Sequence, residues 1–391
     1  MNKLFAFLLP LLFSFSIHAQ WHNQVSGVPE NLYGVAFANK DTGIVTGGSL
    51  YNSVILQTFD GGLHWNPTYM NDSKWLYDAV YTGNGVFFAC GHSGIIYKST
   101  NFGTTWSPKP SNTSEWLYSI FFLTPDTGYC AGQNGVILRT TNAGNNWDPI
   151  SYQAPITLLS IYFYDALHGI TCGMGGRIFR TTDGGSNWEE VENEENKTLT
   201  SIHMLTLDSI LACGMGGMIE FSPDSGLSWQ TIVSTTPFDL NDMIFADRNT
   251  GFIAGDGVLM KTTDAGMSWT HMNYPVTSDL FGVYVVDFGT AYAVGSLGTI
   301  IKNDLSISVE EHSKFHCQIF PNPVSDKLII QTDESGDFIL SIHNMNGQIV
   351  LLDEQSNVSS FEVCVSAWPP GMYMGILTGT EYSKPFRFVV H

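Results

Sequence analysis

An aspartate or asparagine recurs along this chain at intervals of about 40 residues. Repeated carboxylates of this kind could act as general acids and bases or as calcium ligands. Asparagine cannot ionise, however, and it alternates with aspartate at one equivalent position of the repeat. We therefore expect these side chains to accept hydrogen bonds from the backbone of a turn. The six positions are Asp60, Asn101, Asn142, Asp183, Asp224 and Asp264.

Each of these residues belongs to a turn that ends in tryptophan. A serine or threonine stands before the aspartate or asparagine, and a glycine follows it. We expect the glycine to adopt a left-handed backbone conformation and the tryptophan ring to be buried against a neighbouring sheet. The pattern resembles the Asp-box, the bacterial neuraminidase repeat, in which these residues are structural. The tryptophans are Trp65, Trp106, Trp147, Trp188, Trp229 and Trp269.

A fixed period of this length, with turns and no helical segment between them, predicts a β-propeller of four-stranded blades. A leucine marks the first strand of each of seven units. The seventh unit stops at 304 without its tryptophan, whereas an extra one, Trp21, precedes the first unit. We expect residues 21–27 to form the outer strand of the last blade, which closes the ring and removes an exposed sheet edge. The leucines are Leu32, Leu76, Leu117, Leu158, Leu199, Leu240 and Leu280.

The sequence thus predicts an all-β protein, a seven-bladed β-propeller followed by a small C-terminal β-sandwich. The propeller should span 20–304, a polar linker 305–314, and the C-terminal domain 315–391 with about seven short strands. Residues 1–19 begin with a positive charge at Lys3, and their apolar run is too short to span a bilayer. We therefore expect a secretory signal peptide there.

The C-terminal domain has a short motif near its start and a second group of landmarks further on: Pro321, Asn322, Pro323, Gly347, Gly371 and Tyr373. On these residues it resembles the type A sorting domain of the type IX secretion system. The resemblance implies export by the type IX secretion machinery, a secreted or outer cell-surface location, and no transmembrane segment in the mature chain. His391 stands where a final lysine is more usual. The alternative is an appended adhesive sandwich domain.

Acidic residues outnumber basic ones, with 36 Asp and Glu against 16 Lys and Arg and a formal charge of −20. Nucleic acid and anionic membranes both require a basic patch, so neither is expected as a partner. The complete blade pattern resembles the propeller family of photosystem II stability and assembly factors. The photosynthetic members of that family rely on a basic, arginine-rich surface. This acidic chain lacks such a surface, so we do not expect their role to carry over.

The cysteines do not suggest a disulfide framework. Cys90, Cys172 and Cys213 occupy one equivalent position of the blades, and Cys130 lies one residue earlier. Equivalent positions in neighbouring blades should lie beyond the Cα separation of roughly 7 Å that a disulfide allows. We expect buried free thiols. The sequence leaves open whether Cys317 and Cys364 form a disulfide.

No catalytic residue, metal ligand set or cofactor motif stands out. A sialidase would need three converging arginines, but Arg139 and Arg180 precede the turns in a slot that elsewhere holds lysine. Xyloglucanase-type hydrolases use two propellers, and this chain has one. The acidic stretch 189–195 is expected to be a solvated loop, with calcium binding as the alternative. We expect a monomeric, non-enzymatic module that binds an extracellular protein or glycan. The alternatives are a sialidase-like or xyloglucanase-like glycoside hydrolase and a passive cell-surface component.

One face of the propeller is the expected binding face. The turns between second and third strands and the crossovers between blades should share that face, opposite the tryptophan-ending turns. Aromatic residues follow the leucine in four consecutive blades, and two tryptophans precede it. These rings could stack on sugars or grip a peptide, or they could simply pack between blades. They are Tyr33, Trp75, Tyr77, Trp116, Tyr118 and Phe281.

Overall fold

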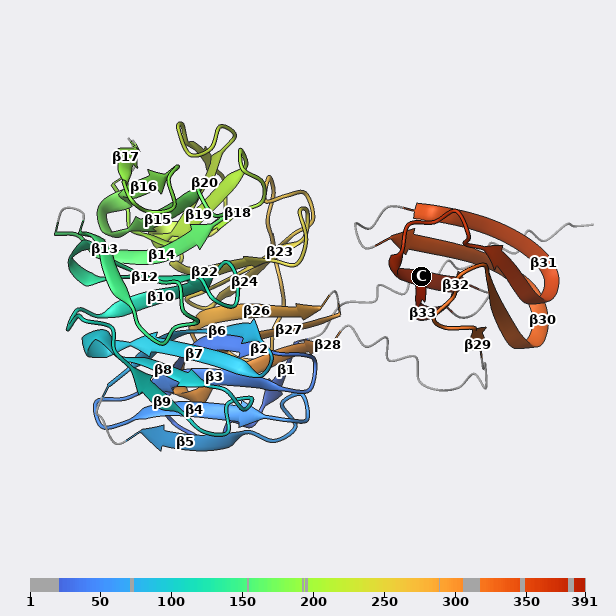
Figure 1. Ribbon diagram of the computed structural model, residues 1–391, viewed down its shortest axis with the longest axis horizontal. Helices are drawn as coiled ribbons and strands as arrows, with labels where there is room; N and C mark the ends of the chain where they lie inside the picture. Colours follow the sequence, from blue (N-terminus) through green and yellow to red (C-terminus); the bar gives the residue numbers. More distant parts are fainter. Residues whose placement is uncertain are drawn as a thin grey trace, which may run out of the picture. The chain divides into compact units, whose positions relative to one another are not determined.

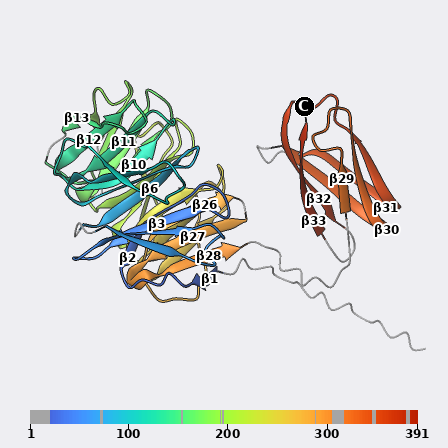
Figure 2. The same cartoon turned by 60° about the horizontal axis from the view of Figure 1, so that its bottom comes forward.

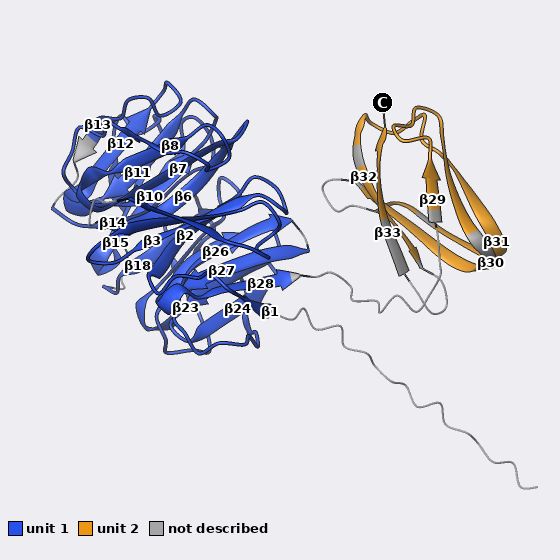
Figure 3. Ribbon diagram, turned by 90° about the horizontal axis from the view of Figure 1, so that it is seen from below, with its two compact units in different colours: residues 1–306 blue, residues 307–391 orange. Residues whose placement is uncertain are grey.

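The computed structural model divides the chain into two compact units, Met1–Ser306 and Ile307–His391 (Figures 1 and 3). It describes residues 21–70, 74–152, 155–191, 193, 196–287, 289–304, 317–344, 349–378 and 383–390. The expected signal peptide 1–19, the linker 305–314 and Gly347 lie outside these ranges. The predicted fold class is confirmed, since the first unit is a seven-bladed propeller and the second a small β-domain. Within these ranges, no helix has the length and hydropathy of a membrane span.

Each blade is a four-stranded antiparallel sheet, and in blades one to six the strands follow chain order from the centre outward. The innermost strands of neighbouring blades lie side by side, as β10, β6, β2 and β26 do in Figure 2. The strands of blades one to three are β2 (Asn31–Phe37), β3 (Gly43–Gly48), β4 (Ser53–Thr58), β5 (Asn66–Met70), β6 (Leu76–Gly83), β7 (Val86–Gly91), β8 (Ile96–Ser99), β9 (Ser107–Lys109), β10 (Leu117–Phe122), β11 (Gly128–Gly132), β12 (Val136–Thr140) and β13 (Asp148–Tyr152). Those of blades four to six are β14 (Leu158–Phe163), β15 (Gly169–Gly173), β16 (Ile178–Thr181), β17 (Glu189–Val191), β18 (Leu199–Met204), β19 (Ile210–Gly214), β20 (Met218–Ser222), β21 (Gln230–Ile232), β22 (Leu240–Phe245), β23 (Gly251–Gly255), β24 (Val258–Thr262) and β25 (Thr270–His271).

Blade seven joins the two ends of the propeller. Its first three strands are β26 (Leu280–Asp287), β27 (Thr290–Gly295) and β28 (Ile300–Asp304), and its outer strand is β1 (Trp21–Gln24). Trp21 pairs with Asn303 and is only 1% exposed. Its ring lies edge-on to Phe252 of blade six, with centroids 6.1 Å apart. Trp21 thus fills, in the blade that lacks a tryptophan-ending turn, the place between sheets that such a tryptophan takes elsewhere.

The turns between second and third strands contain short 3-10 helices in five blades. In blade seven the last glycine of this turn, Gly298, has a φ of 69°, and a Cβ there would lie 1.9 Å from the carbonyl oxygen of Val28. A residue with a side chain would therefore push against the backbone that enters blade one. The helices are η1 (His92–Gly94), η2 (Gln133–Gly135), η3 (Met174–Gly176), η4 (Met215–Gly217) and η5 (Ser296–Gly298).

The turns that resemble Asp-boxes are closed by their own side chains. In blade one, the Thr58 hydroxyl donates to Asp60 Oδ1 at 2.9 Å, and the Gly62 N–H donates to Thr58 Oγ1 at 2.8 Å. The His64 N–H also donates to Asp60, which lowers the pKa of this carboxyl to about 2. The Gly61 N–H bonds the Asp41 carbonyl in the turn between β2 and β3. These turns therefore share a face with the turns between first and second strands, opposite the 3-10 helices.

The second unit contains one five-stranded sheet made of β29 (Cys317–Phe320), β30 (Lys327–Asn344), β31 (Ile349–Cys364), β32 (Gly371–Thr378) and β33 (Ser383–Val390). The sequence predicted about seven short strands, and this count is wrong for the described residues. The strands β30 and β31 are long and stay paired through a break in register between Gln331 and Gly336. Each therefore runs through a bend where separate short strands were expected.

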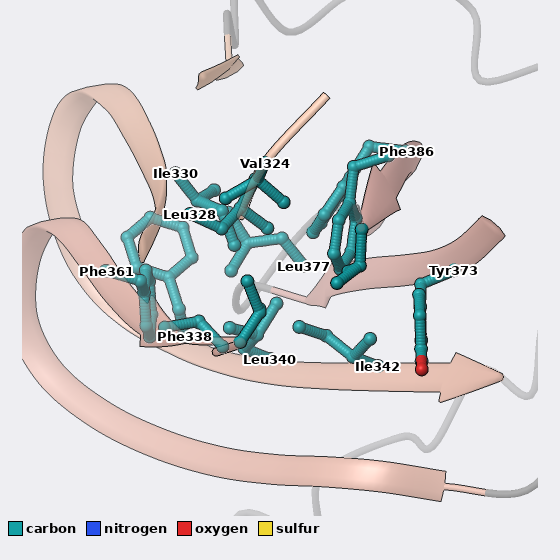
Figure 4. Packing of buried hydrophobic residues seen from close by; sticks show 14 residues of the cluster. Val324, Leu328, Ile330, Phe338, Leu340, Ile342, Phe361, Tyr373, Leu377 and Phe386 are labelled. Atoms are coloured by element: carbon teal, nitrogen blue, oxygen red, sulfur yellow. The ribbon is translucent and has the colours of Figure 1, made fainter. Parts of the chain in front are cut away.

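Buried hydrophobic side chains form one core in this unit, and the sorting-signal residue Tyr373 belongs to it. Figure 4 shows Phe338, Leu340, Phe361 and Leu377 directed toward one another. The amide of Asn322 accepts the Val389 N–H at 3.0 Å and donates to the Arg387 carbonyl, which holds the segment that contains Pro321 and Pro323 against the last strand.

Near the start of β32, Gly371 has a φ of 157°, and the Tyr373 hydroxyl donates to the Pro369 carbonyl at 2.8 Å. Cys364 is an exposed free thiol, so no disulfide joins it to Cys317. In the propeller, Cys90, Cys130, Cys172 and Cys213 are buried and free, as predicted.

Candidate binding face

A β-bulge interrupts the innermost strand of every blade at the same place. The pairing register with the second strand shifts between the ring leucine and the second residue after it, as between Leu76 and Asp78. The residue between them is the extra one, and a bulge of this kind re-aims its side chain. The sequence singled out this position but not the bulge. The seven bulge residues are Tyr33, Tyr77, Tyr118, Leu159, Thr200, Asn241 and Phe281.

The residue after each bulge fixes one blade to the next. Asp78 accepts the Ile120 N–H of blade three at 2.8 Å, and Ser160 accepts the Ile202 N–H of blade five at 3.2 Å. In blade seven the two backbones approach so closely that a Cβ on Gly282 would lie 2.2 Å from the Tyr33 carbonyl oxygen. Each inner strand is thereby held against its neighbour, and the bulge residues are presented as a ring around the channel mouth.

The six aromatic residues predicted from the sequence form one continuous group with His92, which we call the aromatic cluster. Phe281 stacks on Tyr33 with ring centroids 5.2 Å apart, and Tyr33 meets Tyr77 at 5.6 Å. Tyr77 stacks on Tyr118 at 4.8 Å. Other contacts in the cluster include Tyr77–Trp116 at 6.2 Å, Trp75–Trp116 at 6.4 Å and His92–Trp116 at 4.3 Å.

The rings of the aromatic cluster are half-buried. Each of the six predicted side chains keeps part of its surface exposed, whereas rings that pack only between blades, such as Phe88, are fully buried. Burial raises the pKa of the Tyr77 and Tyr118 hydroxyls, so both stay neutral hydrogen-bond donors across the physiological range. The cluster therefore combines a flat apolar surface with neutral polar groups, which is the composition of many ligand sites.

His92 joins the cluster although the sequence marked it only as a turn residue without metal-ligand spacing. The backbone N–H of His92 donates to the Trp75 carbonyl at 2.9 Å, and the imidazole ring stands edge-on to the Trp75 ring. The sequence could have placed His92 beside Trp75, because the turn that holds His92 and the crossover that holds Trp75 are expected on the same face of blade two. Within the described residues, no three His, Cys, Asp or Glu side chains could hold a metal ion together.

Blades six and seven present carboxylates on the same face. We call Asp239, Asp256 and Asp279 the acidic cluster. Asp239 and Asp279 directly precede the ring leucines, as Trp75 and Trp116 do in blades two and three. Burial raises the pKa of Asp256, and the charges of Asp279 and Asp239 raise it further. The channel mouth is therefore aromatic on one side and acidic on the other.

Three arginines of the propeller, Arg139, Arg177 and Arg180, contact other residues of their own or the next blade. Arg180 donates to the Ser225 carbonyl of the next blade at 3.3 Å and pairs with Glu189. Arg139 lies over the Tyr129 ring at 5.8 Å, and Arg177 pairs with Glu190.

Comparisons with known proteins agree with this architecture. Residues 68–141 and 140–236 match the family described as photosynthesis system II assembly factor YCF48. Over these residues the propeller resembles the YCF48 type. Residues 318–391 match the secretion system C-terminal sorting domain. This sorting domain indicates secretion or attachment to the outer surface by the type IX machinery, as the sequence predicted. No curated protein matches the chain.

Solved structures share the fold at low identity. A YCF48 bound to D1 peptide is 18% identical, with a TM-score of 0.62 over 74% of this chain and 96% of that one. YCF48 from Cyanidioschyzon merolae is 19% identical, with a TM-score of 0.61 over 73% and 99%. The WD40 propeller of Doa1 is 10% identical, with a TM-score of 0.60 over 73% and 98%. At such identities the likeness shows the fold alone.

Proposed function

We propose that the YCF48-type propeller is a non-enzymatic binding module that holds an extracellular protein or glycan on its aromatic cluster. The observation that carries the proposal is the contact of seven rings from four blades, each ring adjoining the next at the channel mouth. Rigid aromatic side chains offer contact area at a low cost in conformational entropy. The sorting domain supports a partner outside the cell. A YCF48 structure that carries a D1 peptide supports the view that such a propeller can hold a ligand.

The test is the double variant Tyr77→Ala, Tyr118→Ala, probed with a glycan array and a displayed library of random dodecapeptides. We expect the ligands selected by the unchanged chain to be lost and thermal stability to be kept, because both rings are partly exposed. The matched control is Phe59→Ala, Tyr164→Ala, which removes two exposed rings from the opposite face. Unchanged binding with lower stability would assign the rings to the core and end the proposal.

A glycoside hydrolase is the second candidate, because a carboxylate directly follows the bulge in blades two and six. Burial raises the pKa of both Asp78 and Asp242, as in residues that act as general acids. Each, however, accepts backbone N–H groups from its own blade and from the next, which is the structural role of Ser160. Turnover of chromogenic glycosides that Asp78→Ser abolishes would favour the hydrolase.

A further inference from the structure

We infer that the binding face takes a basic peptide segment of a partner protein, with its lysine or arginine side chains at the acidic cluster and its apolar side chains on the aromatic cluster. This inference rests on the proposed function and specifies the class of its ligand. It follows from the contacts between the two clusters, their charge and the exposed apolar groups beside them.

The acidic and aromatic clusters form one continuous surface. Asp279 of the acidic cluster stands two residues before Phe281 of the aromatic cluster, and both lie at the start of blade seven. Asn241, the bulge residue of blade six, donates to Asp256 at 2.7 Å and to the Leu280 carbonyl at 2.9 Å. Asp239 in turn accepts the Gly216 N–H of blade five at 2.7 Å. A single extended ligand can therefore cover both clusters.

The acidic cluster favours a cation. Asp239 and Asp279 each lie within electrostatic range of Asp256, and among the described residues none of the three forms an ion pair. Lys197 lies at the edge, where its Nζ is 3.5 Å from the position a Cβ would take on Gly216. A lysine or arginine from a partner would relieve the repulsion between the carboxylates and could also lie over the neighbouring rings. The formal charge of −20 would steer a basic partner toward the chain.

Exposed aliphatic side chains extend the apolar area. Leu297 is 78% exposed and has a φ of 56°, a left-handed conformation that is costly for a bulky residue. Its N–H is held by Asn31 Oδ1 at 3.1 Å, and the Asn31 amide also reaches the Tyr33 hydroxyl. Leu50 is 72% exposed on the blade-one turn, whose Gly48 lies against Trp75.

These features favour a peptide over a neutral glycan. Sugar hydroxyls could donate to carboxylates, but they bring no positive charge to offset the repulsion within the acidic cluster. Exposed leucines beside stacked rings match the apolar side chains of a protein, since interface cores are enriched in apolar and aromatic groups. A peptide with both basic and apolar residues satisfies all three features.

The experiment selects random dodecapeptides on the immobilised full chain and measures the affinity of the winners by fluorescence anisotropy. We expect enrichment of lysine or arginine together with leucine or aromatic residues, and affinities that fall with added salt. The variant Asp239→Asn, Asp279→Asn should weaken binding about tenfold or more, the loss of roughly 1.4 kcal/mol that this factor represents. The control Asp41→Asn, Asp126→Asn makes the same charge change on the opposite face and should bind normally.

The outcomes separate this inference from the proposed function. Selection of neutral or acidic peptides, or equal affinity for the Asp239→Asn, Asp279→Asn variant, would overturn the inference. Oligosaccharide binding on the array that disappears in Tyr77→Ala, Tyr118→Ala, without peptide selection, would overturn the inference and keep the proposed function. If the binding of peptides and of glycans is unchanged in Tyr77→Ala, Tyr118→Ala, both the inference and the proposed function are overturned.

Discussion

Trp147 of blade three lies edge-on to Phe88 of blade two, with ring centroids 6.3 Å apart and ring planes at 84°. Trp147 is 0% exposed and also meets Phe122 of its own blade at 5.6 Å. A single side chain thus joins two sheets, and the repeat of this arrangement around the ring ties each blade to the one before it.

We therefore expect Trp147→Ala to lower the free energy of unfolding by about 3–5 kcal/mol, because it leaves a cavity between blades two and three. Urea denaturation followed by circular dichroism would measure the change. Trp106→Ala is the comparison, because that ring is only partly buried and should cost less. An unchanged unfolding midpoint for Trp147→Ala would contradict the role assigned to this tryptophan.

The turn before Trp147 permits a milder test. Asn142 Oδ1 accepts the N–H groups of Asn145 and Asn146, each at 3.1 Å. We expect Asn142→Ala to destabilise the propeller by about 1 kcal/mol, since it leaves these turn donors to water. Asn142→Asp should be nearly neutral, because aspartate holds the same turn in blades one, four, five and six. Equal losses of stability in Asn142→Ala and Asn142→Asp would show that the side-chain oxygen at this position does not stabilise the turn.

The stability of the propeller should depend on pH through the Asp78 carboxyl. Burial, reinforced by the charge of Asp242, raises its pKa from 3.8 to about 7. The folded state then binds this proton more tightly than the unfolded state. The stability contributed by the protonated form is complete below pH 3.8 and is lost as the pH rises through about 7. The variant Asp78→Ser places at this position the serine that blades three to five have there. Relative to the unchanged chain, we expect its free energy of unfolding to rise by about 1–3 kcal/mol between pH 5 and pH 9.

Thermal unfolding of both chains across this pH range would measure the difference. Asp126→Ser on the opposite face is the matched control, because it makes the same substitution at an exposed carboxyl. Parallel profiles for Asp78→Ser and the unchanged chain would mean that Asp78 stays ionised when folded.

Export gives a test of processing. The sorting domain at 318–391 leads us to expect that the extracellular form lacks both residues 1–19 and the C-terminal domain. Intact mass spectrometry of the secreted protein should therefore give a mass well below 43.1 kDa. A chain truncated after 304 should stay inside an export-competent host. Extracellular protein that still ends in His391 would contradict removal of the domain.

The sequence by itself determined the blade architecture. The period of the tryptophan-ending turns and the seven leucines gave the number of blades, because a repeat needs the same local contacts in each copy. The surplus Trp21 pointed to the pairing that β1 makes with β28. In the C-terminal unit the same reasoning overcounted the strands, since nothing local distinguishes a bent strand such as β30 from two short ones.

Only the tertiary structure decided how the site is assembled. The sequence placed Tyr33, Tyr77, Tyr118 and Phe281 at one position of the repeat, but their mutual stacking depends on a bulge and on how closely neighbouring inner strands approach. His92 and the acidic cluster lie on turns and on the crossovers between blades. Their contacts on this face are with residues of other blades, which local sequence does not show. Local sequence records the period of a repeat, whereas side-chain contacts across blades depend on ring closure. Closure brings together residues that are far apart in the chain, as in the 3.2 Å bond from the Tyr284 hydroxyl to the Phe37 carbonyl, 247 positions away.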